Sequence, residues 1–426
     1  MWSAETNRQL VQMLQEMIRI DTSNLPGNER KMTDYIADCL EQAGISYQVI
    51  EKKKNRSNLI AKLPATVEKK EKPLLLLSHI DVVPAQGEWE QPPFSGNIED
   101  GVLYGRGAID TKHLTAMELM TVLLLQKENG KRNRDVYLIA SADEEKGSEF
   151  GMKFLSEEHR EFIPDGYTIS EGGGFVITQS GQRYRTCTCG EKGEASITVT
   201  GRGEKNFTDC SHSTAYRVLE ALEKISSYEP KETLCRSTKQ FCRITGKEFS
   251  DPTMKNLWEY STRDNLVVNA FTLDFSEMPS EATLHLSYKF IPGTEGICYT
   301  DKEEGKEKIG SLMKEILKDS AEFEVTSLED GYECEMENEF ITALEKVSDQ
   351  FNPGVRLLPI IALGRTDGRF IGKNVYGYSP MLEDQPFSEI LKIIHRENER
   401  ITLNSLIYGG RVIYETVKSV CSQKNE

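Results

Sequence analysis

The amino-acid sequence predicts an α/β protein in which a mixed, mostly parallel sheet is sandwiched by helices, with a smaller α+β domain inserted into it. In the first 180 residues, short apolar runs alternate with stretches of helical periodicity, which is typical of a parallel sheet covered on both faces. Within residues 187–331 the strands instead alternate apolar and polar side chains, as half-exposed sheets do. A chain of 426 residues also fits two domains better than one core.

The first part of the chain supplies this alternation element by element. Its expected helices span residues 5–20, 28–44 and about 111–127, with another from Gly147 onward. Its expected strands span residues 58–62, 74–77, 135–141 and 167–170. The strand at 74–77 consists of four consecutive leucines after Pro73, and a continuous apolar run of this length indicates burial on both faces.

The middle and the end of the chain define the domain organisation. Strands are expected at 194–201, 282–291 and 322–327, and helices at 212–226 and 301–318. After about residue 337 the pattern returns to helix and apolar strand, and it ends in a helix over 403–420. The simplest interpretation is a discontinuous domain formed by residues 1–186 and 332–426, interrupted by a second domain over 187–331.

Composition excludes several classes of protein. A net charge of −16 argues against nucleic acid as a partner, because such binding needs a basic surface. No apolar run is long enough to span a membrane, and the N-terminus lacks the apolar core and cleavage site of a signal peptide. The nine cysteines form no paired CxxC pattern, as expected for reduced thiols. We therefore expect a cytoplasmic protein that binds neither membranes nor nucleic acid.

Residues suited to metal binding follow several predicted strands and turns. They are His79 and Asp81 after 74–77, Asp110 at a helix start, Glu144 and Glu145 after 135–141, and Glu171 after 167–170. In parallel sheets, ligands bind beyond the carboxyl ends of the strands. Separate segments therefore direct imidazole and carboxylate groups toward one edge of the predicted sheet.

Each of these residues also has a simpler interpretation. Asp110 can cap the helix that follows it, and Glu144 and Glu145 can complement a helix dipole. Taken together, however, the set suits zinc, which binds histidine nitrogen and carboxylate oxygen. A carboxylate such as Asp110 can bridge two ions, and Asp81 can fix the tautomer of His79. Of two adjacent glutamates, one can bind metal while the other takes a proton from water.

The order of the motifs resembles one family. The motifs concerned are His79-x-Asp81, Gly105–Lys112, Asp143-Glu144-Glu145-x-Gly147-Ser148, Glu171-Gly172-Gly173, Gly364-Arg365-Thr366-Asp367 and His395-x-x-Asn398-Glu399-Arg400-Ile401. They are similar to those of the di-zinc metallopeptidases that include acetylornithine deacetylase, succinyl-diaminopimelate desuccinylase, aminoacylase and carboxypeptidases G and S. The Glu-Gly-Gly segment is most similar to the carboxypeptidase S and aminoacylase branch. This resemblance implies a zinc exopeptidase-like fold with an inserted lid and dimerisation domain, and a homodimer formed through that lid.

The resemblance also implies a role for each site residue. One divalent ion would be held by His79 and Glu171, the other by Glu145 and His395, with Asp110 bridging the two. Glu144 would be the general base and Asp81 the acid that orients His79. Zinc is the expected metal, although cobalt and manganese also suit these ligands.

The predicted lid departs from the family pattern. Lys205 stands where the family has a histidine that stabilises the oxyanion, and Lys289 stands where it has an arginine. Residues 276–279 differ from its Asn-Val-Ile-Pro segment as well. We expect Lys205 or His212 to act as the oxyanion donor. Arg365 is the predicted anchor for a substrate carboxylate, with Lys289, Lys205 and Arg369 as the other candidates.

These motifs predict a metallopeptidase or amidohydrolase of the carboxypeptidase, dipeptidase or N-acyl amino acid deacylase type. The expected reaction is hydrolysis of an amide or peptide bond in an N-acyl amino acid or small peptide, by a water that two zinc ions activate and from which Glu144 takes a proton. The alternative is a catalytically impaired homologue that acts as a metal-bound binding module, because the lid contacts are altered. A nucleotide-binding protein fits poorly, since Gly172-Gly173-Gly174 has neither G-x-G-x-x-G spacing nor a P-loop lysine.

Overall fold

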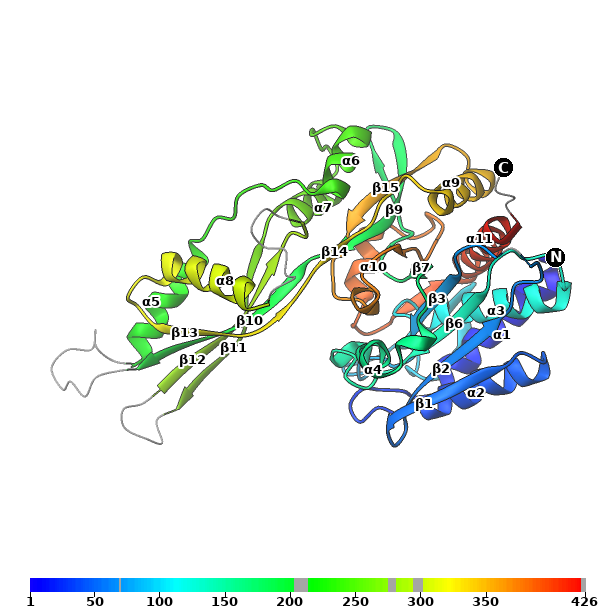
Figure 1. The fold of residues 1–426 in the computed structure, drawn as a ribbon, viewed down its shortest axis with the longest axis horizontal. Helices are drawn as coiled ribbons and strands as arrows, with labels where there is room; N and C mark the ends of the chain where they lie inside the picture. The colour runs from blue at the N-terminus through cyan, green and yellow to red at the C-terminus, as the bar shows by residue number, and fades with distance from the viewer. Residues whose placement is uncertain (69, 203–213, 275–280, 294–301, 423–426) are drawn as a thin grey trace.

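The computed structural model describes residues 1–68, 70–202, 214–274, 281–293 and 302–422. Figure 1 shows an α/β part that contains both ends of the described chain, and a second part that extends away from it on long strands. The predicted fold class is confirmed, because a large mixed sheet lies among helices and a smaller antiparallel sheet is built from the middle of the sequence.

The large sheet has ten strands in the order β1-β2-β6-β3-β7-β16-β9-β14, with β8 and β15 also paired to β9. Its centre, β6-β3-β7-β16, is parallel, whereas the pairs β1-β2 and β2-β6 are antiparallel. The strands are β1 (Tyr47–Lys53), β2 (Arg56–Leu63), β3 (Leu74–His79), β6 (Val136–Ser141), β7 (Tyr167–Ser170), β8 (Val176–Gln179), β9 (Gln182–Glu191), β14 (Tyr332–Glu333), β15 (Val355–Ile361) and β16 (Val375–Gly377).

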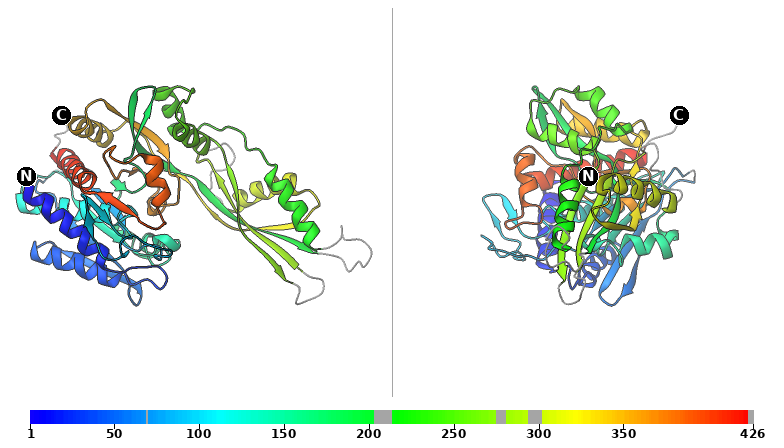
Figure 2. Two further views of the ribbon diagram at one scale, coloured as in Figure 1. Left: turned by 180° about the vertical axis from the view of Figure 1, so that it is seen from behind. Right: turned by 90° about the vertical axis from the view of Figure 1, so that its left-hand side faces the viewer.

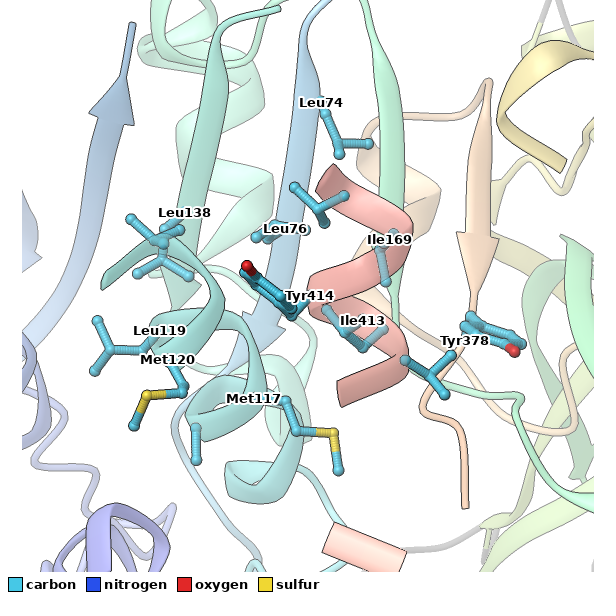
Figure 3. Packing of buried hydrophobic residues seen from close by; sticks show 14 of the residues in the cluster. Leu74, Leu76, Met117, Leu119, Met120, Leu138, Ile169, Tyr378, Ile413 and Tyr414 are labelled. Carbon is cyan, nitrogen blue, oxygen red and sulfur yellow. The ribbon is translucent and has the colours of Figure 1, made fainter. Parts of the chain in front are cut away.

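Strand β3 lies in the middle of this sheet and is buried on both faces, as its run of leucines predicts. Leu74 and Leu76 belong to the main core, while Leu75 and Leu77 belong to a second cluster on the other face. Figure 3 shows the main core, in which side chains of β3 and its neighbours approach those of two helices; the labelled residues include Leu76, Leu138, Ile169, Met117, Ile413 and Tyr414.

Helices cover both faces of the large sheet. The main core includes residues of α1 (Ala4–Arg19), α2 (Arg30–Gln42), α3 (Lys112–Glu128), α9 (Glu339–Phe351) and α11 (Leu403–Ser422). The second cluster packs α4 (Met152–Glu158) on the opposite face. Local sequence sets several boundaries: Ser3 caps α1 by accepting a hydrogen bond from the backbone N–H of Thr6, and Asn338 caps α9 in the same way.

The smaller sheet is antiparallel, with the order β11-β12-β10-β13. Its strands are β10 (Gly193–Arg202), β11 (Asn265–Asp274), β12 (Glu281–Phe290) and β13 (Glu322–Glu329), and helices α5 (Thr214–Ser226) and α8 (Lys302–Leu317) pack against it. Together they form a separate hydrophobic core. Figures 1 and 2 show this unit extending away from the α/β part.

Two helices in the middle of the chain do not follow the predicted pattern. Helices α6 (Arg236–Thr245) and α7 (Pro252–Thr262) pack with β8, β9 and β15 of the large sheet rather than with the smaller sheet. The domain limits at 187 and 331 therefore remain a prediction, and we propose that this helical pair functions with the α/β part.

The remaining described elements are short. They are the strands β4 (Ile98–Glu99), β5 (Val102–Tyr104) and β17 (Arg400–Thr402), which form a small sheet, helix α10 (Phe387–Ile393), and the 3₁₀ helices η1 (Glu144–Lys146), η2 (Arg160–Phe162) and η4 (Asp367–Phe370). Among the described residues, no helix is both long and apolar enough to cross a membrane.

Candidate metal centre and active site

A cavity of about 680 Å³ lies between the large and the small sheet. The α/β part contributes six of the predicted site residues to its lining: Asp110, Glu144, Glu145, Glu171, Arg365 and His395. The facing wall comes from β10 and β13, which contribute Glu194, Ser196, Ser327 and Glu329. The cavity thus contains the sheet edge at which the sequence predicts metal binding.

The first half of the centre is built around His79, the last residue of β3. Its Nε2 lies 3.1 Å from Oδ1 of Asp110 and 3.3 Å from Oε2 of Glu171, which directly follows β7. Parallel pairing of β3 with β7 brings these strand ends together, as the arrangement of parallel sheets predicts.

The second half is built around His395. Its Nε2 lies 2.8 Å from Oδ2 of Asp110 and 3.2 Å from Oε2 of Glu145. His395 is not on a helix: it lies just beyond α10 in left-handed backbone, with a φ of 61°. Asp110 therefore stands between the two histidines and faces each with a different carboxylate oxygen.

The donor set fits a two-ion site. Although burial lowers it, the charge of Glu171 and the hydrogen bond with Asp110 hold the pKa of His79 well above its usual value. The hydrogen bonds with Asp110 and then Glu145 raise the pKa of His395 to about 10. The carboxylates thus favour positive charge at two adjacent points. Oε1 of Glu145 is also buried without a hydrogen-bond partner among the described residues, as an unused metal-ligand oxygen would be.

Glu144 lies in the same cavity, beside the ligand candidates. Its carboxylate belongs, with the imidazole of His79 and the carboxylate of Glu171, to a group whose donor atoms are all within 4.8 Å of one another. Burial, followed by the negative charge of Glu171, raises the pKa of Glu144 well above its usual value. Burial and a neighbouring negative charge both favour the protonated form of a carboxyl group, which suits a residue that accepts and returns a proton.

Asp81 supports both histidine and glutamates. The ring Nδ1 of His79 lies 2.9 Å from the backbone oxygen of Asp81 and 3.6 Å from its carboxylate, so the carbonyl is the nearer acceptor. The carboxylate instead accepts hydrogen bonds from the backbone N–H groups of Glu144 (3.0 Å) and Glu145 (3.3 Å). Asp81 therefore directly orients the turn that carries Glu144 and Glu145, a function that the sequence did not indicate.

A buried network behind this turn involves residues that sequence reasoning missed. The side-chain amide of Asn24 donates to Asp81 and to Asp143, each at 2.8 Å. Arg56 donates to Asp143 at 2.6 Å and to Glu29 through both Nε and NH2. Asp143 has a left-handed backbone, with a φ of 65°, so these bonds hold the turn that presents the glutamates. Asn24 and Arg56 carry no motif that marks them for this role.

Glu399, which belongs to the C-terminal motif, holds the loop that carries Asp110, the proposed bridging residue. Its carboxylate is fully buried and accepts hydrogen bonds from the backbone N–H groups of Ile109 (2.7 Å), Asp110 (3.0 Å) and Gly107 (3.1 Å). It also pairs with Arg106 at 2.6 Å. The motif that contains His395 and Glu399 thus supplies both a ligand candidate and the residue that holds the Asp110 loop.

The predicted substrate-binding residues differ from one another in their positions relative to the cavity. The guanidinium of Arg365 lines the cavity but faces three carboxylates: Glu191 at 3.2 Å, Glu194 at 3.4 Å and Glu329 in a short hydrogen bond. Lys289 is half-buried on β12 opposite Glu194 and is not among the residues that line the cavity in the described part of the chain. Lys205, His212 and residues 276–279 lie outside the described residues.

Comparison with known proteins shows one family. The model of peptidase family M20/M25/M40 matches residues 75–419. A probable succinyl-diaminopimelate desuccinylase of Staphylococcus aureus is 24% identical over 377 residues, which cover 87% of this chain and 89% of the relative.

Solved structures of the same family share the fold. The M20 family metallo-carboxypeptidase Sso-CP2 from Sulfolobus solfataricus superposes with a TM-score of 0.73 at 17% identity, covering 97% of this chain and all of that one. The YXEP protein of Bacillus subtilis, described as a dinuclear metal binding peptidase, has a TM-score of 0.60 at 12% identity, with 99% and 100% coverage.

Proposed function

Because the chain belongs to peptidase family M20/M25/M40, a family of hydrolytic metalloenzymes, we propose that it hydrolyses an amide or peptide bond in an N-acyl amino acid or small peptide. The observation that carries this proposal is the position of Asp110, whose two carboxylate oxygens lie 3.1 Å from His79 and 2.8 Å from His395. A carboxylate between two imidazoles, each with a further glutamate, is the ligand arrangement that a pair of divalent ions requires.

The proposed ligands divide into two sets that share one residue. His79 and Glu171 would hold one ion, Glu145 and His395 the other, and Asp110 would bridge them. Zinc is the proposed metal because the ligands are nitrogen and oxygen donors, and cobalt and manganese suit the same set. When bound, such ions polarise the substrate carbonyl and lower the pKa of a water molecule.

The residues of the chain perform the proton transfers. Glu144 takes a proton from the attacking water and later delivers it to the leaving amine, for which its raised pKa is suited. Asp81 keeps Glu144 and Glu145 in fixed positions through their backbone N–H groups. The wall formed by β10 and β13 covers the cavity opposite the ligands and limits the access of water to the bound substrate.

The alternative is an impaired homologue that only binds. It would rest on the altered lid residues, of which Lys205 lies outside the described residues. In the described part of the chain, four of the five proposed ligands and the proposed base line one cavity, the fifth ligand, His79, contacts two of them, and nothing there favours loss of activity. An oxyanion donor contributes roughly 3–4 kcal/mol to catalysis, so losing one slows turnover without abolishing it.

We also propose a homodimer formed through the smaller sheet. Strand β11 is at the edge of that sheet and exposes a row of large apolar side chains: Val267, Val268, Phe271 and Leu273. An exposed apolar edge strand is a template for pairing with another chain, and a second copy would cover it. A cytoplasmic location likewise remains a prediction.

Metal loading and a substrate panel test the proposal. The purified protein is stripped with a chelator, reloaded with zinc and assayed by elemental analysis, and turnover is then measured on N-acyl amino acids and dipeptides. We expect two equivalents of metal per chain and metal-dependent hydrolysis of at least one substrate class. Failure to bind even one equivalent contradicts the metal centre, while two equivalents without turnover on a broad panel favours the binding module.

A further inference from the structure

One wall of the active-site cavity is apolar, and we call it the apolar wall. It is formed by five residues of the α/β part that line the cavity: Phe175, Leu363, Phe387, Leu391 and Ile394. The lining from β10 and β13 consists of serine and glutamate side chains instead. A cavity with one apolar and one polar wall can distinguish the chemical groups on the two sides of a bound molecule.

Helix α10 supplies most of the apolar wall because of the spacing of its apolar residues. Phe387, Leu391 and Ile394 are four and then three residues apart, so they lie on one side of the helix. The ring of Phe387 packs against that of Phe175, with their centroids 4.7 Å apart, and it belongs to a buried cluster that includes residues of β15. The apolar wall is therefore backed by a packed core.

Leu391 is the most open part of the apolar wall. Its side chain is 39% exposed and belongs to none of the hydrophobic clusters of the described chain, whereas Phe387 is 6% exposed. A single exposed leucine on a protein surface is ordinary. Leu391, however, lines a cavity together with four other apolar side chains, so a bound apolar group would remove its surface from water.

The apolar wall lies next to the proposed metal ligands. Ile394 directly precedes His395, whose Nε2 lies 2.8 Å from Oδ2 of Asp110. At the other end of the wall, Phe175 follows Glu171 by four residues. A scissile amide beside these ligands therefore places one of its neighbouring groups against the apolar wall.

We propose that the apolar wall binds a bulky aliphatic or aromatic group of the substrate beside the scissile amide. The enzyme consequently selects N-acyl amino acids or small peptides with such a group over those that carry a methyl or a charged group there. A charged group would lose its hydration against the wall without gaining a hydrogen bond. This inference rests on the proposed function and deepens it by naming the class of substrate.

Two series of substrates measure this selection and distinguish the two sides of the amide. Within the best substrate class of the panel, one series varies the side chain on the amine side (alanine, leucine, aspartate). The other varies the acyl group (acetyl, 3-methylbutanoyl, succinyl). Burial of a leucine-sized group corresponds to a rise in kcat/KM of about 10- to 100-fold over the methyl compound. We expect the wild-type enzyme to show this rise in at least one series, with no rise for the charged compound of that series.

Leu391→Asn tests the apolar wall directly, because it places a polar side chain of similar size at a partly exposed position. We expect the preference for the bulky apolar group to fall below about threefold, mainly through a higher KM, and Leu391→Met to retain it. Leu219→Asn is the matched control, because Leu219 is a 57% exposed leucine of α5 that does not line the cavity in the described part of the chain. It should leave both the activity and the preference unchanged.

Two results overturn the inference: a wild-type enzyme without preference for the bulky apolar group in either series, and a preference that Leu391→Asn leaves unchanged. Metal content and thermal melting of each variant identify losses that come from misfolding. If Leu391→Asn fails these checks, Leu391→Ala decides the question, because it removes apolar contact without adding a polar group.

Failure of the proposed function has a different signature. If the wild-type enzyme hydrolyses no compound of either series, calorimetric titration of the metal-loaded protein with the methyl and bulky apolar compounds replaces the kinetic assay. Tighter binding of a bulky apolar compound that is lost in Leu391→Asn supports the inference even then. Equal binding, or no binding of any compound, overturns it.

Discussion

Replacement of Glu399 by glutamine is expected to destabilise both the protein and its metal centre. The buried carboxylate accepts hydrogen bonds from three backbone N–H groups of the Asp110 loop and from Arg106, which is itself 2% exposed. A glutamine keeps one acceptor oxygen and turns an NH2 group toward the remaining donors. Removing the charged partner of a buried arginine costs about 3–5 kcal/mol, so we expect a loss of unfolding free energy of that size.

Urea unfolding of the metal-free protein measures the free energy, and elemental analysis measures the metal retained per chain. Glu389→Gln is the control, because Glu389 is 57% exposed and pairs with Lys392 on the surface of α10. Such a pair contributes at most about 1 kcal/mol. Equal unfolding midpoints for the two variants, with full metal content in Glu399→Gln, would refute the reasoning.

Three further outcomes are expected. Glu144→Gln abolishes turnover while two metal ions remain bound, because Glu144 is proposed to contact water rather than metal, whereas Glu145→Gln also loses metal affinity in elemental analysis; exchanged phenotypes would reverse the two assignments. Chelator treatment removes activity and zinc restores it, and activity that persists in metal-free protein contradicts the mechanism. Phe271→Lys, on the exposed edge of β11, converts a dimer to a monomer in light scattering, and a wild-type monomer at micromolar concentration rules out the proposed interface.

Much of the fold follows from local sequence patterns. The leucines at 74–77 predict a strand buried on both faces, and the structure has β3 at the centre of the large sheet. Helices α1 and α9 begin at side chains that cap them, close to the predicted starts. Helices α6 and α7 were missed, because their packing with β8 and β15 depends on contacts between distant segments rather than on a long periodic pattern.

The candidate site was likewise predictable from the sequence only in part. The positions of His79, Asp110, Glu144, Glu145 and Glu171 after strands and turns predict that they meet, because parallel strands end at one edge. His395 follows no predicted strand, and the family resemblance alone supplied its role. Its contact with Asp110 depends on the left-handed backbone beyond α10.

By itself, the sequence determined the fold class, the residue types of the site and their order along the chain, since these depend on periodicity and on the chemistry of each side chain. Only the tertiary structure decided which groups neutralise one another. The motif predicts Arg365 as a substrate anchor, yet in the structure its guanidinium faces three carboxylates brought by β9, β10 and β13. The physical reason is that ion pairs and hydrogen bonds act over a few ångströms, so their partners are set by how distant strands pack rather than by the neighbours of a residue in the chain.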